Sequence, residues 1–217
     1  MAEEIVERLR RLDACAVSDA LDRLGIEGAV SGLAPRSVAR RIAGRVRTVG
    51  LGAAAAVSSP RHLCTAAIET AQAGEIIVVE QRTGIEAAGW GGILSIGAVA
   101  KGIAGVIVDG PARDIDEAAD LDFPVYARSV TTRTARGRIA EISSGAPVTI
   151  GAVTVAEGDY VVADRSGVVF IKKGDVARVI DAAAQIAARE AAMAAAARAG
   201  TPIASVMGAD YEAMLKR

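Results

Sequence analysis

Residues 89–117 read GWGGILSIGAVAKGIAGVIVDGPARDIDE, and this stretch decides the fold class of the chain. It predicts a helix over 93–101, a buried strand over 104–109 and a short helix over 115–121. Another buried strand is predicted just before it, over 75–80. The order strand, helix, strand is typical of a parallel pair joined by a crossover helix, so the chain is predicted to be an α/β protein.

The segments on either side fit the same class. Helical spacing or helix boundary signals predict further helices over 3–12, 17–24, 60–72 and 208–215. Further strands are predicted over 42–49 and 124–127, and residues 28–35 are predicted to form a loop. Residues 147–171 resemble a meander of short antiparallel strands. Asp175 then begins a long Ala-rich helix that Gly200 ends. We expect one three-layer domain over residues 1–217, with a mixed sheet, a βαβ core and an antiparallel β layer.

The composition is typical of a globular chain and argues against several functions. Of the 217 residues, 52% are hydrophobic and 24% are charged, which is typical of a folded domain. A net charge of −1 and only 3% aromatic residues argue against a nucleic-acid partner. No apolar run reaches the roughly 18 residues that a membrane span needs. The charged N-terminal segment has no apolar signal core, so we expect a cytoplasmic protein without a membrane partner.

The glycine turn before the predicted helix 93–101 is a candidate anion site. The first amides of a helix lack internal acceptors and lie at the positive end of the helix dipole. Glycines allow a ligand to approach the backbone closely. The amides of Gly91, Gly92, Ile93 and Leu94 could therefore bind a carboxylate or phosphate. The alternative is a turn that only connects two elements.

Arg113 and Asp114 follow the predicted strand 104–109, and ligands of α/β sheets gather at the carboxyl ends of strands. The guanidinium of Arg113 could hold a carboxylate or an enolate oxygen. Asp114 is a hard oxygen ligand of the kind that Mg²⁺ prefers. A structural alternative is equally open, because Asp114 and Glu117 have the spacing of a helix capping box. Asp116, Glu117 and Asp120 are otherwise interpreted as a solvated helix face.

Other reactive residues are given structural interpretations. The single histidine, His62, has no second imidazole for a zinc site and no nucleophile motif near it. Cys15 and Cys64 fit no metal or redox spacing and are expected to be reduced, partly buried thiols. Trp90 is expected to cover the candidate site or to fill an interface.

Several motifs resemble the RraA-like proteins, which include the regulator of ribonuclease activity A and the class II 4-hydroxy-4-methyl-2-oxoglutarate aldolases. They are GWGG, the twenty residues between Gly92 and Arg113, and VDGPARDIDE followed by DFPVYAR. Matches outside this core are VSDAL with a following Leu-Gly at 17–25, and the Gly-Asp, Ala-Asp and Gly-Val-Val groups at 158–169. The resemblance therefore spans most of the chain.

This resemblance implies a swivelling β/β/α domain that forms a homotrimer or hexamer, with active sites at subunit boundaries. Arg113 would hold a pyruvyl group, and Asp114 would face Mg²⁺ or Mn²⁺. The amides around Gly91 to Leu94 would take the substrate carboxylate. Glu190, on the late helix of a neighbouring subunit, would support the waters of the metal.

One position departs from the aldolase pattern, because the aldolases carry an Asp where this chain has Gly92. The missing carboxylate puts metal affinity and the general base in question. No lysine lies in an apolar strand that would form a site, which favours a metal over a Schiff base for stabilising an enolate.

Together with the residues above, this resemblance implies a divalent-metal-dependent lyase for small 2-oxo acids. It would cleave 4-hydroxy-2-oxo acids such as 4-hydroxy-4-methyl-2-oxoglutarate, decarboxylate oxaloacetate, or do both, through a pyruvate enolate. The alternative is a non-catalytic regulator that binds a ribonuclease or another protein. A methyltransferase, a third possibility, would need an adenosylmethionine loop, and no segment has a convincing one.

Overall fold

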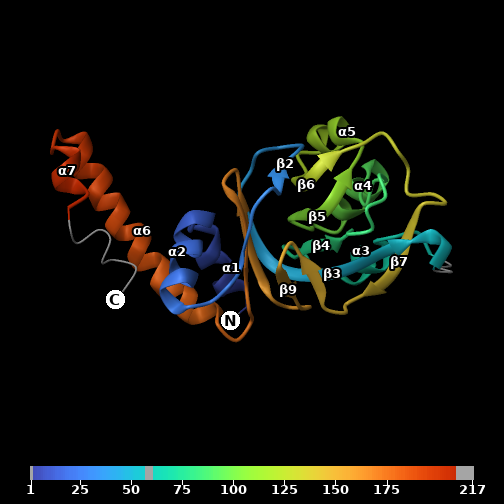
Figure 1. Cartoon of the computed structure of the whole chain (residues 1–217), viewed down its shortest axis with the longest axis horizontal. Helices are drawn as coiled ribbons and strands as arrows, with labels where there is room; N and C mark the ends of the chain where they lie inside the picture. Colours follow the sequence, from blue (N-terminus) through green and yellow to red (C-terminus); the bar gives the residue numbers. More distant parts are fainter. Residues whose placement is uncertain (1, 57–60, 209–217) are drawn as a thin grey trace.

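A computed structural model describes residues 2–56 and 61–208 of the chain. Its main sheet has nine strands in the order β1-β11-β10-β3-β4-β5-β6-β2, with β7 paired to β3 (Figure 1). These strands are β1 (Ala29–Val30), β2 (Ala34–Pro35), β3 (Ile42–Ala53), β4 (Ile76–Glu80), β5 (Gly105–Ala112), β6 (Val125–Val130), β7 (Ile139–Ser144), β10 (Tyr160–Asp164) and β11 (Gly167–Ile171). A separate hairpin is made of β8 (Val148–Ile150) and β9 (Val153–Val155).

The helices fall into two groups along the chain. Those near the two ends are α1 (Ala2–Arg10), α2 (Ala14–Leu24), α6 (Val176–Arg198) and α7 (Ile203–Val206). Those in the middle are the 3-10 turn η1 (Ala54–Ala56), α3 (Thr65–Thr70), α4 (Gly92–Ala100) and α5 (Ile115–Asp120). Within the described ranges, no helix has the length and apolar character that crossing a bilayer requires.

Strands β3, β4, β5 and β6 run parallel and form the centre of the sheet. Successive residues of β4 face opposite sides: Ile77 and Val79 pack in the cluster with α3, α4 and α5, whereas Ile76 and Val78 pack with the β8–β9 hairpin and β10–β11. A parallel strand covered on both faces has no polar face, which explains the unbroken apolar run of β4. The predicted βαβ core is confirmed, with α4 as the crossover helix between β4 and β5.

The antiparallel part of the sheet begins on the same strand, β3. Its first residues, from Ile42 to Arg45, pair antiparallel with β10, whereas Val46 to Gly50 pair parallel with β4. Helices α1, α2 and α6 cover this part and bury a second cluster of apolar side chains (Figure 1). The result is helices, a parallel sheet and a β layer, which is the predicted three-layer mixed α/β fold.

Several predicted boundaries differ from the structure. The loop predicted over 28–35 contains the short strands β1 and β2, β7 was not predicted, and the helix predicted over 60–72 is the shorter α3. Most of the helix predicted over 208–215 lies outside the described residues, which end in α7 instead. Asp175 stands at the start of α6, but its side chain accepts no helix amide and pairs with Arg178.

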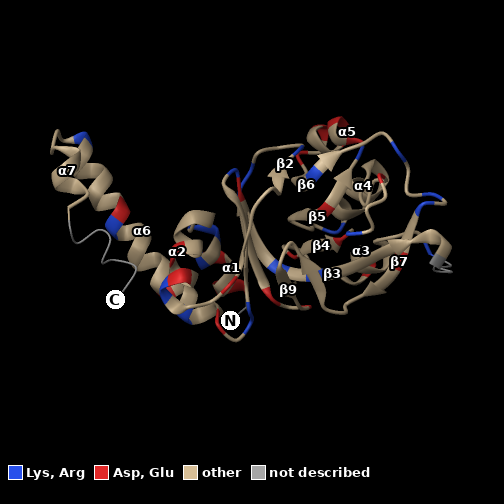
Figure 2. Ribbon diagram, in the orientation of Figure 1, with Lys and Arg blue, Asp and Glu red and all other residues tan. Residues whose placement is uncertain are grey.

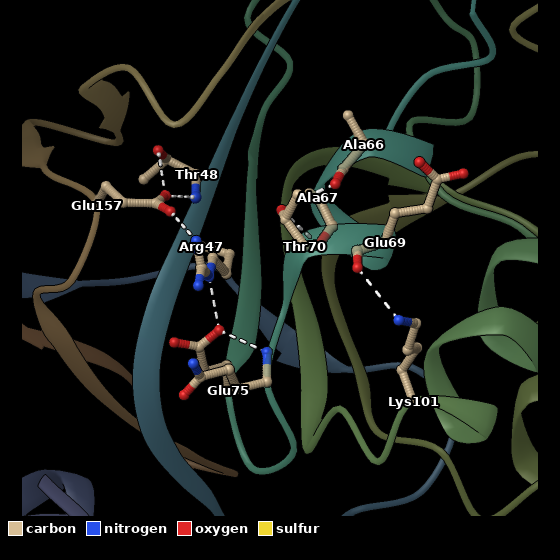
Figure 3. Close-up of polar contacts among 10 residues, drawn as sticks. Arg47, Thr48, Ala66, Ala67, Glu69, Thr70, Glu75, Lys101 and Glu157 are labelled. Carbon is tan, nitrogen blue, oxygen red and sulfur yellow. Dashed lines mark hydrogen bonds and ion pairs between the residues drawn. The ribbon is translucent and has the colours of Figure 1, made fainter.

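An ion-pair network fixes the N-terminal end of β4 against β3 (Figure 3). The Nε of Arg47 lies 2.6 Å from Oε2 of Glu75, and its Nη1 lies 2.5 Å from Oε1 of Glu157. The other oxygen of Glu157 accepts a 3.0 Å hydrogen bond from the amide of Thr48. The hydrogen-bonding groups of these residues are paired with one another, so they act as structural contacts at this end of the sheet. The candidate site lies at the opposite end of the strands.

Candidate active site

The candidate site forms where β5 ends and α4 begins. The backbone joins the two segments directly: the amide of Gly89 donates to Pro111 O at 2.9 Å, and that of Arg113 donates to Trp90 O at 3.0 Å. A Cβ at Gly91 would lie 2.9 Å from Oδ2 of Asp114, so only glycine lets the turn approach this closely. The predicted meeting of the glycine turn with the Arg-Asp pair is therefore present in the fold.

Asp114 adopts a left-handed backbone conformation, with φ 56° and ψ 45°. A non-glycine residue rarely adopts this conformation, and such residues gather at functional sites. Asp114 stands at the start of α5, but its carboxylate makes no capping bond to that helix. Its Oδ2 instead accepts hydrogen bonds from the amide of Gly92 at 2.9 Å and from Nε of Arg113 at 3.0 Å. The capping-box interpretation is therefore wrong, because the strained backbone directs the carboxylate to α4.

These contacts set the charge of Asp114. Burial alone would raise the pKa of its carboxyl group, but the Gly92 amide and then the hydrogen bond and charge of Arg113 outweigh burial. The net effect is a pKa below the ordinary aspartate value. Asp114 is thus an anion at neutral pH, in the state that a metal ligand requires.

A pocket of about 210 Å³ opens between these groups. The residues predicted from the glycine turn and the strand end all line it, namely Gly91, Gly92, Ile93, Leu94, Arg113 and Asp114. The amide of Gly92 is already used by Asp114. The amides of Ile93 and Leu94 belong to the first turn of α4, where a helix supplies no acceptor, and they remain for an anionic ligand.

Glu117 is a functional candidate that the sequence interpretation missed. A Cβ built on Gly92 would lie only 1.7 Å from Oε2 of Glu117, so this carboxylate fills the space that a side chain at position 92 would need. Glu117 was assigned to a solvated helix face, and the residue is exposed there, but its carboxylate also lies beside Gly92 of α4. The available signal was the spacing, since residues three apart on a helix share a face. Asp114 and Glu117 thus both border the first residue of α4.

Two carboxylates suit one class of metal ion. In the described part of the chain, no group of three or more His, Cys, Asp or Glu residues could hold a metal ion. A closed protein cage for zinc or calcium is therefore not formed by these residues. Mg²⁺ keeps most of its waters and takes one or two carboxylates, so Asp114 and Glu117 fit a hydrated ion of this kind.

Glu190 lies elsewhere in the chain. It is on α6 and lines a different pocket, of about 450 Å³, together with Asp13, Cys15 and Asp164. Burial, followed by the charges of Asp19 and Asp13, raises the pKa of Glu190. Figure 1 shows α6 extending away from the helices that carry the candidate site. A role for Glu190 beside Arg113 therefore needs a second copy of the chain.

Trp90 supports the glycine turn from the core. Its side chain is 1% exposed, and its ring stacks on Phe123 with centroids 6.2 Å apart. Its indole Nε1 donates to Oγ of Ser95 at 2.9 Å, and that hydroxyl donates to Gly91 O at 3.2 Å. Trp90 also lines the candidate pocket, which agrees with the predicted role as a cover of the site, whereas the predicted interface role is wrong because the residue is buried.

The two cysteines and the histidine form no bond with one another in the described part of the chain. Cys64 is buried and Cys15 is exposed, and neither is in a disulfide. His62 lies in the wall of the pocket, where its Nδ1 is 3.1 Å from Leu63 O. Arg136 lies in the same wall and was not predicted, because the loop that carries it is remote from the glycine turn in sequence.

Comparison with known proteins gives relatives of several kinds. The chain is 29% identical to the "Putative 4-hydroxy-4-methyl-2-oxoglutarate aldolase" of Halalkalibacterium halodurans, over 83% of this chain and 82% of the relative. Protein DlpA of Legionella pneumophila is 25% identical over 82% of this chain. The matched part is only 29% of the longer DlpA protein.

Solved structures agree with this relationship. A crystal structure of an uncharacterized protein from Pseudomonas syringae superposes with a TM-score of 0.86 and 27% identity, covering 96% of this chain and 98% of that one. RraAS2 of Streptomyces coelicolor, described as an unusual member of the RNase ES inhibitor RraA protein family, gives a TM-score of 0.76 and 25% identity, covering 84% and 92%. The family model for RraA-like proteins, described as Aldolase/RraA, matches residues 14–170. This match covers more than half of the sequence, so the chain belongs to the RraA-like family.

Proposed function

We propose that the protein is a lyase for small 2-oxo acids that works with Mg²⁺ or Mn²⁺. The reactions are the retro-aldol cleavage of 4-hydroxy-2-oxo acids and the decarboxylation of oxaloacetate. The observation that carries this proposal is the meeting of Arg113, Asp114 and the first-turn amides of α4 in one pocket of about 210 Å³. Such a pocket suits a three-carbon acid, and the name of the Halalkalibacterium relative supports an aldolase.

The chemistry must stabilise the enolate of pyruvate. In retro-aldol cleavage the 4-hydroxyl loses its proton and becomes a carbonyl as the C3–C4 bond breaks. The electron pair of that bond passes into the enolate, which is then protonated at C3. Arg113 uses Nε for Asp114, which leaves its two Nη groups as donors for the oxygen where charge develops.

Other groups of the chain would hold the substrate in place. The amides of Ile93 and Leu94, at the positive end of α4, are proposed to bind its C1 carboxylate. Asp114 and Glu117 would hold the divalent cation, which when bound supplies Lewis-acid stabilisation of the developing negative charge. Lysine is absent from the described residues that line the pocket, so they offer no amine for a Schiff base.

Glu190 of a neighbouring subunit is proposed as the general base, acting through water. Its raised pKa brings it closer to the range in which a carboxylate accepts a proton efficiently. Association into a homotrimer or hexamer has support beside the pocket, where α4 presents an apolar stripe to the outside. Ile93, Ile96 and Val99 are 81%, 50% and 41% exposed and lie on one side of the helix. We propose this stripe as part of the subunit contact that completes the site.

The decisive experiment measures pyruvate release from oxaloacetate and from 4-hydroxy-4-methyl-2-oxoglutarate, with Mg²⁺ and with a chelator. We expect metal-dependent turnover that Arg113→Ala and Asp114→Asn abolish. Asp116→Asn is the matched control, since Asp116 is exposed on the same helix and does not line the pocket. Absence of metal-dependent turnover on both substrates would remove the lyase proposal.

A regulator of a ribonuclease is the second candidate, and the likeness to RraAS2 favours it. Such a protein would bind its partner without using the pocket. Co-purification of a ribonuclease with the wild type and equally with Asp114→Asn would support this function. Loss of the interaction in Asp114→Asn would argue against a role independent of the pocket.

A further inference from the structure

A second pocket, of about 330 Å³, adjoins the candidate site. The two pockets share a wall that is made of residues from two loops, namely His62, Leu63, Thr134, Ala135 and Arg136. A ligand held by Arg113 in the first pocket could therefore extend past this wall into the second. The second pocket is larger than the first, so it has room for more than the carbon dioxide that oxaloacetate releases.

The lining of the second pocket is basic. The described residues that line it include Arg61, His62 and Arg136, and none of these described residues is acidic. The loop over 131–138 that contributes Arg136 carries three arginines and no acid, although the whole chain has a net charge of −1. Figure 2 shows these basic positions as blue segments along the loop between β6 and β7. Local positive charge in a concave surface attracts an anionic group.

Arg136 differs from the other arginines of its loop. Arg133 pairs with Glu86 at 3.7 Å, and Nη1 of Arg138 donates to Thr134 O at 3.1 Å. Among the described residues, no acceptor lies within bonding distance of the Arg136 guanidinium. A guanidinium binds a carboxylate through two parallel hydrogen bonds, so this side chain can serve one on the shared wall.

We infer that the second pocket receives the part of the substrate that is split off, and that Arg136 selects substrates in which this part carries a carboxylate. The inference rests on the proposed lyase function, and it names Arg136 as the residue that determines specificity.

Binding of two matched ligands tests the inference without relying on turnover. 2-Oxoglutarate and 2-oxopentanoate have the same carbon chain and differ in a terminal carboxylate or methyl group. We expect calorimetry in Mg²⁺ buffer to show wild-type protein binding 2-oxoglutarate about tenfold more tightly or better. Arg136→Gln should remove most of this preference, whereas Arg133→Gln should keep it, because Arg133 lines neither pocket.

Kinetics give a second measurement in the same variants. The ratio of kcat/KM for 4-hydroxy-2-oxoglutarate to that for 4-hydroxy-2-oxopentanoate should fall about tenfold in Arg136→Gln. An unchanged preference in both measurements, or none in the wild type, overturns the inference and leaves the lyase proposal intact. Failure of the wild type to bind either 2-oxo acid overturns the lyase proposal and this inference with it.

Discussion

Replacing Asp114 in two ways separates its structural role from its chemical role. Asp114 holds a left-handed backbone and accepts hydrogen bonds from Gly92 and Arg113. Asparagine tolerates the left-handed conformation and keeps an oxygen acceptor, whereas alanine does neither. Both substitutions remove the negative charge. We therefore expect Asp114→Asn and Asp114→Ala to be equally inactive but unequally stable.

The magnitudes follow from the contacts. Losing a hydrogen bond to a charged acceptor costs about 1.5 kcal/mol at the low end, which suits a side chain that is 29% exposed. Forcing alanine into the left-handed region adds about 1–2 kcal/mol. Asp114→Ala should therefore destabilise the protein by about 3 kcal/mol. Asp114→Asn loses mainly the half-exposed ion pair, which is worth about 1 kcal/mol or less.

Urea unfolding measures the stability difference, and Mg²⁺-dependent pyruvate release measures activity. Both variants should lose about 100-fold or more in kcat, as expected when a group that stabilises developing charge is removed. Asp122 provides a matched control, because it also has a positive φ, of 50°, but is exposed and lies outside the pocket. Asp122→Ala should be destabilised by the backbone strain and by the loss of its ion pair with Arg40, and it should remain active.

Two results would refute this reasoning. Equal stability losses in Asp114→Asn and Asp114→Ala would show that the left-handed backbone carries no cost for alanine. Full turnover in Asp114→Asn would show that the charge of Asp114 is not used in the reaction.

Four further predictions concern the carboxylates. The pKa of Asp114 is lowered by folding, so its stabilisation is present above the unfolded pKa of about 3.9 and is lost as the pH falls through the folded value. Urea unfolding should show a constant gap between wild type and Asp114→Asn near neutral pH, and a shrinking gap below about pH 4. Glu117→Gln should weaken Mg²⁺ affinity in a metal titration of activity. Gly92→Asp, whose Cβ would meet Glu117 at 1.7 Å, should be tolerated better when combined with Glu117→Ala than alone. The pKa of Glu190 is raised, so its contribution to stability is favourable below the unfolded pKa of about 4.3 and is lost as the pH rises through the folded value. Glu190→Gln should therefore raise Tm at pH 7, with no gain below about pH 4, while turnover falls if a neighbouring Glu190 acts as the base.

The sequence alone determined the central βαβ unit and the place of the candidate site. The apolar run of β4, the helix α4 and the run of β5 are local patterns, and each element forms close to its predicted residues. Arg113 and Asp114 follow β5 directly, so the end of the strand carries them to the start of α4. The periodicity that predicts each element, and the position of Arg113 and Asp114 directly after the strand, can be read from residues that are close in the sequence.

The tertiary structure alone decided how the side chains of the candidate site are arranged. The direction of the Asp114 carboxylate depends on the left-handed backbone of Asp114 itself. Its hydrogen-bond partner, Gly92, lies 22 residues earlier in the sequence. Glu117 occupies the space at Gly92 because α4 and α5 pack side by side. Arg136 reaches the pocket from a loop beyond β6, and Glu190 lies on a helix that packs elsewhere. Contacts of this kind join residues that are far apart along the chain, and periodicity and spacing describe only neighbours, so the folded chain was needed to bring them together.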